Sequence, residues 1–217
     1  MQRGAVCGGE AVRWALPIVL VACRYYGSTT PAAAPAVQPQ PSPYASQVEL
    51  GSIAGVHTFS SDNALGAPPP PARDSLRDSA LFGARLGWYF AGHFGVEAQL
   101  AVVPTEARTT VYDVWTVLAE ARAVCAPFGN AVDRPVPFLF AGGTLYDVLS
   151  SGGQPGTGIG SGSLVAPDVG VGIKDPFGNG WGLRADASVL FPSAVGGGVT
   201  EDFELVLSIY RSYGAAP

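Results

Sequence analysis

The chain has 217 residues, a formal net charge of −5, and only 13 % charged residues beside 47 % hydrophobic ones. A soluble domain usually has about 25 % charged residues, so this chain is short of charge. The acidic balance argues against nucleic-acid binding, because a phosphate binder needs a basic patch. After the first residues, no run of about 18 uninterrupted apolar residues occurs, so the sequence predicts no membrane-spanning helix.

The first 22 residues resemble an export signal, because Arg3 and Arg13 precede or flank a short apolar run at 15–22. We therefore predict a signal peptide at 1–22. The four residues that end at Cys23 (LVAC) resemble the lipobox of bacterial lipoproteins, which would place a lipid on the Cys23 thiol. The alternative is an ordinary signal peptide that is cleaved nearby, so that Cys23 is either removed or left without a function.

The remaining cysteines do not form a disulfide pattern. Cys7 would leave with the signal peptide, and Cys125 then has no obvious partner. No C-x-x-C or H-E-x-x-H motif is present, so we predict no bound metal ion and no cofactor.

After the signal, residues 23–46 are rich in Pro and Ala and are predicted to form an extended tether. Residues 47–213 alternate strand patterns with turn signals, and 214–217 form a short tail. The eight predicted strands are 48–59, 80–90, 93–103, 111–124, 137–148, 163–174, 181–191 and 203–211. These lengths are nearer the roughly 9–11 residues that a tilted strand needs to cross a bilayer than the roughly 5–6 residues of a typical soluble strand. Segment 111–124 has a helical alternative because LAEARA has high helix propensity, but its β-branched and aromatic residues favour a strand.

The connections between these strands alternate in length. Those at 91–92, 131–136 and 175–180 are short or tightly turned, and those that begin near 60, 104, 151 and 192 are looser. Bacterial outer-membrane barrels have this asymmetry, with short periplasmic turns and longer outer loops.

Most predicted strands have one apolar face and one face that mixes charge with glycine, while strands 48–59 and 137–148 are ambiguous. A soluble barrel or sandwich would bury the apolar face, and a membrane barrel would turn it toward lipid. Glycine on the polar face suits a narrow barrel interior, and its charges nearly balance, as expected where water is scarce. Aromatic residues gather near strand ends, as in the girdles of membrane barrels: Trp88, Tyr89, Phe90, Phe94, Trp181, Phe191, Phe203 and Tyr210. These features favour the membrane barrel.

This arrangement assigns a side to each residue. The predicted charge network of the lumen comprises Arg85, Glu97, Glu120, Arg122, Asp168, Lys174, Arg184, Asp186 and Glu204. The predicted lipid-facing residues are Leu86, Trp88, Val96, Leu100, Leu183, Leu205 and Leu207.

The stretch GARLGWYFAGHFGVEAQLAVVPTE resembles the second and third strands of OmpA-type eight-stranded outer-membrane barrels. The later stretches FLFAGGTLYDV, APDVGVGIKDPFGNGWGLRADASVLF and FELVLSIYRSY resemble strands five to eight of that domain, so the likeness covers about residues 47–213. It implies an all-β, eight-stranded, antiparallel up-and-down transmembrane barrel in the outer membrane of a Gram-negative bacterium. Members of the family commonly end on an aromatic residue, which belongs to a terminal signal read by the insertion machinery. Here Tyr213 is followed by Gly-Ala-Ala-Pro, so either Tyr213 serves as that residue or the signal is altered. We carry over no peptidoglycan-binding activity.

Candidate chemistry is sparse. Some small outer-membrane barrels modify lipid A with His and Ser, and His57 is followed by Ser60 and Ser61, although the sequence indicates no acid partner. His93 lies beside a tight turn and is predicted to be solvated at the interface. The glycine-rich segment 156–162 lacks the ending of a phosphate-binding loop and is predicted to be an outer loop.

We therefore predict a non-enzymatic outer-membrane barrel, without catalytic residues, whose plugged lumen passes at most a leak current rather than working as a porin. Its role would be structural or depend on surface contacts through the outer loops. The alternatives are a lipid A-modifying enzyme that uses His57 and a secreted soluble ligand-binding β-barrel. The expected partners are outer-membrane lipid, the barrel-assembly machinery and unknown surface ligands, with no nucleic acid, and the barrel is expected to be a monomer.

Overall fold

The computed structural model describes residues 47–65, 74–109, 113–129, 134–150 and 159–214. The predicted signal peptide at 1–22, the tether at 23–46 with Cys23, and most of the short tail lie outside these residues. No helix in the described part of the chain has the length and apolarity needed to cross a bilayer.

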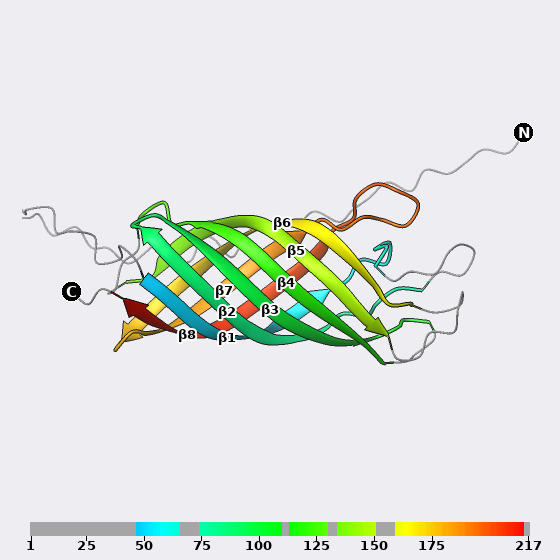
Figure 1. Ribbon diagram of the computed structural model, residues 1–217, viewed down its shortest axis with the longest axis horizontal. Helices are drawn as coiled ribbons and strands as arrows, with labels where there is room; N and C mark the ends of the chain where they lie inside the picture. The colour runs from blue at the N-terminus through cyan, green and yellow to red at the C-terminus, as the bar shows by residue number, and fades with distance from the viewer. Residues whose placement is uncertain (1–46, 66–73, 110–112, 130–133, 151–158, 215–217) are drawn as a thin grey trace, which may run out of the picture. The chain divides into compact units, whose positions relative to one another are not determined.

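The described residues form a closed antiparallel barrel in which each strand pairs with its neighbour in sequence and the first strand pairs with the last (Figure 1). Its strands are β1 (Gln47–Thr58), β2 (Ser79–Ala91), β3 (Phe94–Glu106), β4 (Asp113–Cys125), β5 (Val136–Ser150), β6 (Gly162–Gly178), β7 (Trp181–Leu190) and β8 (Asp202–Gly214). The predicted all-β, eight-stranded antiparallel fold is confirmed, and the described part of segment 111–124 is strand.

Most strands are longer than their sequence patterns suggested. β3 continues through Pro104 to Glu106, which had been assigned to a loop, and β6 continues to Gly178 with an irregularity near Pro176. Proline lacks only its own N–H, so the flanking residues keep the ladder through these positions. The barrel wall is therefore taller than the predicted strand bounds implied.

The two ends of the barrel differ. At one end, called the short-turn end, Gly92 and His93 join β2 to β3, and Asn179 and Gly180 join β6 to β7. Asn179 and Gly180 have φ angles of 52° and 77°, as a two-residue turn that matches strand twist requires. β1 begins and β8 ends here too, because Gln47 pairs with Gly214. The other end, the loop end, carries the longer connections, and described parts of them fold inward through bridges such as Asn63 with Ala194.

The interior holds two apolar clusters. Near the short-turn end the cluster consists of Tyr89, Val124, Ala126, Val136, Phe138 and Phe140. Toward the loop end a larger cluster combines wall residues such as Leu118 and Tyr146 with Leu65, Leu76 and Ile159 from the connections. Charged side chains contact both clusters: Lys174 lies over the Tyr89 ring, and Asp202 is hydrogen-bonded to Tyr146. Both clusters lie inside the barrel, whose interior, with eight strands, is about wide enough to hold side chains.

Inward-facing glycines make room for inward-facing aromatic rings. A Cβ added at Gly95 would lie 2.4 Å from the ring of Tyr89, and one at Gly182 would lie 2.3 Å from the ring of Tyr210. The prediction that Tyr89 and Tyr210 belong to an exterior girdle is therefore wrong: both rings are buried inside the barrel. Trp88, Phe90, Phe94, Trp181 and Phe203 are exposed on the exterior, and Phe191 is half-buried.

The alternation of buried and exposed positions also resolves the two ambiguous strands. On β1, Glu49, Ile53 and His57 face inward. On β5, Phe138, Phe140, Thr144, Tyr146 and Val148 face inward, while Leu139, Leu145 and Leu149 face outward. Both faces of β5 are apolar, so alternation in hydrophobicity could not distinguish them.

Candidate functional site: the packed lumen

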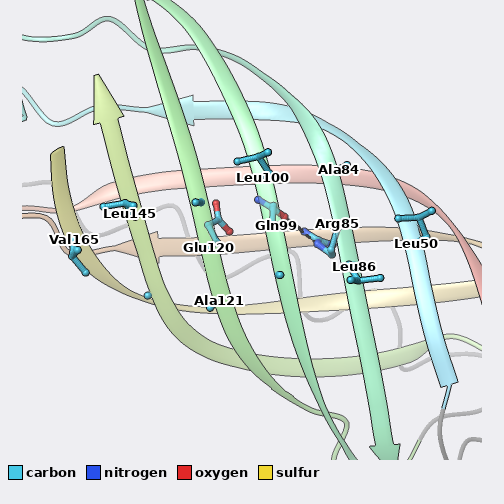
Figure 2. A pocket seen from close by; sticks show the side chains of 13 residues that line it. Leu50, Ala84, Arg85, Leu86, Gln99, Leu100, Glu120, Ala121, Leu145 and Val165 are labelled. Carbon is cyan, nitrogen blue, oxygen red and sulfur yellow. Dashed lines mark hydrogen bonds between the residues drawn. The ribbon is translucent and has the colours of Figure 1, made fainter. Parts of the chain in front are cut away.

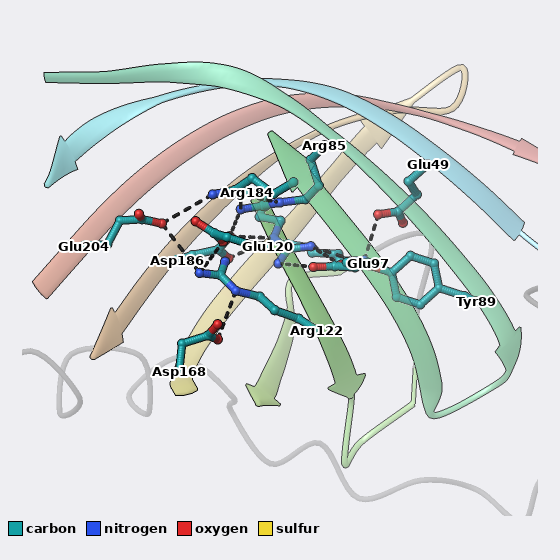
Figure 3. Close-up of polar contacts among 12 residues, drawn as sticks. Glu49, Arg85, Tyr89, Glu97, Glu120, Arg122, Asp168, Arg184, Asp186 and Glu204 are labelled. Carbon is teal, nitrogen blue, oxygen red and sulfur yellow. Dashed lines mark hydrogen bonds and ion pairs between the residues drawn. The ribbon is translucent and has the colours of Figure 1, made fainter. Parts of the chain in front are cut away.

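All nine charged residues predicted for the lumen are buried inside the barrel, none with more than 5 % of its surface exposed. They form one connected set, which we call the lumenal charge network (Figure 3). Burying charges costs several kcal/mol per ion unless each is paired and hydrogen-bonded, so the partners matter more than the count.

Arg184 on β7 is the centre of the network near the short-turn end. Its Nη2 donates to Glu97 Oε2 at 2.8 Å, its Nη1 donates to Glu97 Oε1, and its Nε donates to Asp186 Oδ1 at 2.8 Å. Glu97 lies on β3, so this ion pair crosses the lumen between strands that are not neighbours. The guanidinium also lies 4.2 Å from the centroid of the Phe138 ring, a cation–π distance.

Arg85 on β2 continues the network. Its Nη2 lies 2.6 Å from Asp186 Oδ2, and its Nε donates to Gln99 Oε1 at 3.0 Å. The Nε2 of Gln99 in turn donates to Glu204 Oε1 at 3.4 Å. Gln99 thus links the two halves of the network, a role that the sequence did not indicate because a glutamine carries no charge to balance.

Arg122 on β4 is surrounded by carboxyl groups. It lies 2.5 Å from Glu120, 3.1 Å from Asp168 and 3.6 Å from Glu204. Asp168 also accepts a hydrogen bond from Thr144 Oγ1 at 3.0 Å. A single guanidinium therefore holds three acidic side chains that project from three strands.

Lys174 on β6 pairs with a residue that the sequence did not assign. Its Nζ donates to Glu49 Oε2 at 2.8 Å and lies 3.6 Å from the centroid of the Tyr89 ring. Tyr89 donates its hydroxyl to Glu97, which connects this pair to Arg184. Glu49 was missed because β1 was ambiguous, and Tyr89 because an aromatic residue near a strand end resembles a girdle residue.

His57 lies inside the barrel toward the loop end and has no exposed surface. Its Nδ1 lies 3.2 Å from Glu204 Oε2, and its Nε2 lies 3.8 Å from Asp202 Oδ2. Asp202 also accepts hydrogen bonds from Asn63 Nδ2 at 2.7 Å and from the Ser60 amide at 2.8 Å. The imidazole therefore has two acidic neighbours, and its edge packs against the Phe59 ring at 4.4 Å between centroids.

This geometry bears on the candidate chemistry of His57. The nearby Ser60 hydroxyl accepts a hydrogen bond from Thr200 Oγ1 at 2.5 Å and is not hydrogen-bonded to the imidazole in the described structure. Ser61 is exposed in the adjoining turn. Among the described residues, no three His, Cys, Asp or Glu side chains are arranged to hold a metal ion. The imidazole acts here as a buried link between β1 and β8.

The structure changes the expected charge balance of the lumen. Glu49 and Asp202 add two carboxyl groups, and the described interior adds no Lys or Arg to Arg85, Arg122, Lys174 and Arg184. The surplus of acid lies toward the loop end, where Glu120, Asp168, Asp202 and Glu204 share Arg122 and His57. The near balance that the sequence suggested holds only near the short-turn end.

The seven residues predicted to face lipid are all exposed on the outer surface of the barrel. In Figure 2, Leu50, Leu86, Leu100, Leu145 and Val165 surround one shallow depression, and Arg85, Gln99 and Glu120 lie behind the same strands. Cys125 is half-buried and free. Whether lipid covers this surface stays a prediction.

Sequence comparisons identify no relative. No protein-family model matches the chain, and no curated protein matches it.

Solved structures do match the barrel. The N-terminal β-barrel domain of Pseudomonas aeruginosa OprF matches with a TM-score of 0.53 at 12 % identity, over 77 % of this chain and 97 % of that one. The outer membrane protein OprG from the same organism matches with a TM-score of 0.55 at 12 % identity, over 79 % of this chain and 97 % of that one. Neisserial surface protein A matches with a TM-score of 0.51 at 12 % identity, over 77 % and 97 %.

The chain has the fold of the eight-stranded outer-membrane barrels. The resemblance noticed in the sequence is therefore confirmed at the level of the fold. Identity this low carries no further statement about ligand or activity.

Proposed function

We propose that this chain is a small bacterial outer-membrane protein whose lumen is closed by its own side chains and whose contacts are made by the loop end. The short-turn end would then face the periplasm, because membrane barrels have short periplasmic turns and longer outer loops. Its role would be structural or depend on surface contacts, without catalysis.

The observation that carries this proposal is the chemical contrast between the two faces of the wall. The exterior exposes large apolar side chains over every strand, including Leu100, Trp115, Leu139, Val171 and Leu207. A soluble monomer rarely exposes an apolar patch of more than a few hundred Å². On the strands that the structure describes, exterior charges lie near the strand ends, for example Glu106 and Asp113 at the loop end. Lipid is the environment that suits such a surface.

The closed lumen is inferred from packing. The lumenal charge network links opposite walls, and two apolar clusters lie in the same interior. Arg184 with Glu97 and Arg122 with Asp168 occupy the space through which ions would pass. We therefore expect only leak currents when the purified barrel is added to a planar bilayer. A stable, reproducible open channel would contradict the closed lumen.

Membrane residence is tested by expressing the chain with its own leader in a Gram-negative host and separating the membranes on a density gradient. We expect the protein in the outer-membrane fraction, with an electrophoretic mobility that differs between boiled and unboiled samples. Recovery from the soluble periplasm, without a mobility change, would favour a secreted barrel and contradict the proposal.

The enzymatic alternative has its own test. The buried position of His57 gives it no route to outer-leaflet lipid in the described structure, so we expect the lipid A mass spectrum to be unchanged by expression of the protein. His57→Ala is the matched variant. A lipid A modification that appears with the wild-type chain and is lost in His57→Ala would contradict the non-enzymatic proposal.

A further inference from the structure

A groove of about 410 Å³ lies on the exterior over β6, β7, β8 and β1. Small side chains at Ser52, Ala54 and Ala185 contribute its floor, and Leu183, Leu207 and Ile209 contribute its walls. The lining takes two outward-facing residues from each of the four strands, and these residues are in register with one another, so the groove crosses the strands. Its lining suits a linear hydrocarbon chain.

An arginine lies where this groove approaches the short-turn end. Arg211 is the next outward position after Ile209 on β8, and its neighbours in register are Trp181 on β7 and Leu50 on β1. Its guanidinium carbon lies 5.6 Å from the ring centroid of Trp181 and 5.2 Å from that of Tyr213. Among the described residues no carboxylate lies within ion-pair distance of it. The two rings therefore lie against an exposed guanidinium that the described residues do not pair with a carboxylate.

The groove also has an acidic member. Asp175 on β6 lines it and faces outward, opposite Leu183 in the ladder, and Leu183 is opposite Ile209. Asp175 is therefore separated from Arg211 by the width of β7, toward the same end of the barrel. A cation and an anion on the exterior, next to an apolar groove, form a zwitterionic pattern.

Two other apolar grooves on the exterior lack this pattern. One is lined by Leu50, Ala84, Leu86 and their neighbours, and another by Val56, Leu139, Val171 and theirs. Their charged members are Arg85 and Glu120 in the first and Glu204 in the second, and all three side chains point into the lumen. A pocket at the loop end also has exterior charges, but there Arg77 is already paired with Glu106 at 3.1 Å and most of the lining is polar. The groove beside Arg211 differs because its lining is mainly apolar and the described residues offer Arg211 no paired carboxylate.

We propose that this groove binds one phosphatidylethanolamine molecule of the periplasmic leaflet. One acyl chain lies along Ala185 and Ala54, the phosphate accepts hydrogen bonds from Arg211, and the ammonium group faces Asp175. Arginine suits this role because its planar guanidinium donates two parallel hydrogen bonds to a phosphate. The proposal rests on the proposed function, since it needs the short-turn end to face the periplasm and the exterior to face lipid.

Native mass spectrometry of the full-length barrel, purified in detergent and titrated with phosphatidylethanolamine, tests the site. The wild-type protein should retain one lipid under activation that strips the remaining adducts. Arg211→Gln should weaken that retention about tenfold or more, because a charge-assisted hydrogen-bonded contact is lost. Arg134→Gln is the matched control, because Arg134 is exposed just before β5 and outside the groove. Equal losses in the two variants would show a general charge effect and overturn the site.

Two further variants test the groove and the headgroup. Ala185→Leu should fill the groove and reduce retention, whereas Ala98→Leu, in a different exterior groove, should not. Asp175→Asn should remove the preference for phosphatidylethanolamine over phosphatidylglycerol while retention of phosphatidylglycerol persists. Retention by Ala185→Leu at the wild-type level would overturn the placement of the acyl chain, and an unchanged preference in Asp175→Asn would overturn the placement of the headgroup.

The same samples separate failure of the site from failure of the proposed function. Each variant is first mixed with lipid vesicles, and folding is read from the mobility difference between boiled and unboiled samples. A wild-type chain that does not insert would contradict the outer-membrane proposal. A chain that inserts but holds no phosphatidylethanolamine selectively would contradict only the lipid site.

Discussion

The inner and outer faces of this barrel are built from alternate residues of the same strands, yet they follow opposite rules. On β7, Arg184, Asp186 and Ser188 are buried, while Leu183 and Ala187 are exposed. A buried residue of the inner face needs a specific partner on a distant strand, as Arg184 needs Glu97. An exposed residue of the outer face needs only to be apolar and of moderate size. Tolerance to substitution should therefore alternate along every strand.

The largest effect is expected when an interior charge loses its partner. Arg184→Leu leaves Glu97 and Asp186 without their central cation, and breaking a buried ion pair in this way costs about 3–5 kcal/mol. The free energy of unfolding, measured by urea titration in lipid vesicles with Trp fluorescence, checks this. Arg211→Leu makes the same chemical change on the exterior and should cost far less. Similar losses in both variants would remove the distinction between the faces.

A smaller loss is expected when charge is introduced on the outer face. Ala187→Arg on β7 places a guanidinium on the proposed lipid surface and should cost about 2–4 kcal/mol if it lies near the bilayer midplane. Ala123→Arg on β4, close to the short-turn end, should cost about 0–1 kcal/mol because the penalty falls toward the interface. The same urea titration compares them. An Ala187→Arg barrel as stable as the wild type would indicate that this face does not contact lipid.

The smallest loss of stability is expected when a glycine of the inner face is replaced, compared with a glycine of the outer face. A Cβ added at Gly170, on the inner face of β6, would lie 2.2 Å from the Phe140 ring and 2.5 Å from the Ala187 carbonyl oxygen. Gly170→Ala should therefore destabilise by about 1–3 kcal/mol through overpacking. Gly143, on the outer face of β5, has its nearest such contact at 3.8 Å. Gly143→Ala should leave stability unchanged or raise it slightly, and an equal loss in both would refute the role of Gly170 in seating the ring.

The sequence predicted much of this wall because one face of most strands carries charge and the other does not. On the β2–β3 hairpin, the contrast between charged Arg85 and Glu97 and apolar Leu86 and Val96 is sufficient to assign both faces. Strand bounds were less accurate, because residues such as Pro104 resemble loop residues although they stay in the ladder.

The contacts inside the lumen were beyond sequence reasoning. Strand pairing brings Arg184 beside Lys174 and Ser208 in register, whereas its ion pair is with Glu97, across the lumen on β3. Such pairs depend on the tilt and stagger of the closed barrel, which no single strand encodes. Tyr89 was misjudged because its type and its place near a strand end suggested an exterior girdle, whereas its position in the alternation places it inside. For His57 the sequence indicated no acidic partner, whereas Glu204 and Asp202 on β8 lie beside it.

The seam between β1 and β8 has a consequence for how the chain acquires its structure. His57 and Glu204, which meet across it, are 147 residues apart in sequence. During synthesis and export the edge of β1 must remain unsatisfied until β8 has emerged, and contacts between such distant residues make folding slow. Interior pairs that cross the lumen, such as Arg184 with Glu97, need the barrel to be nearly closed, so a partly assembled barrel would expose these charges in an open sheet. A chaperone that shields the β1 edge during this interval should raise the yield of folded protein.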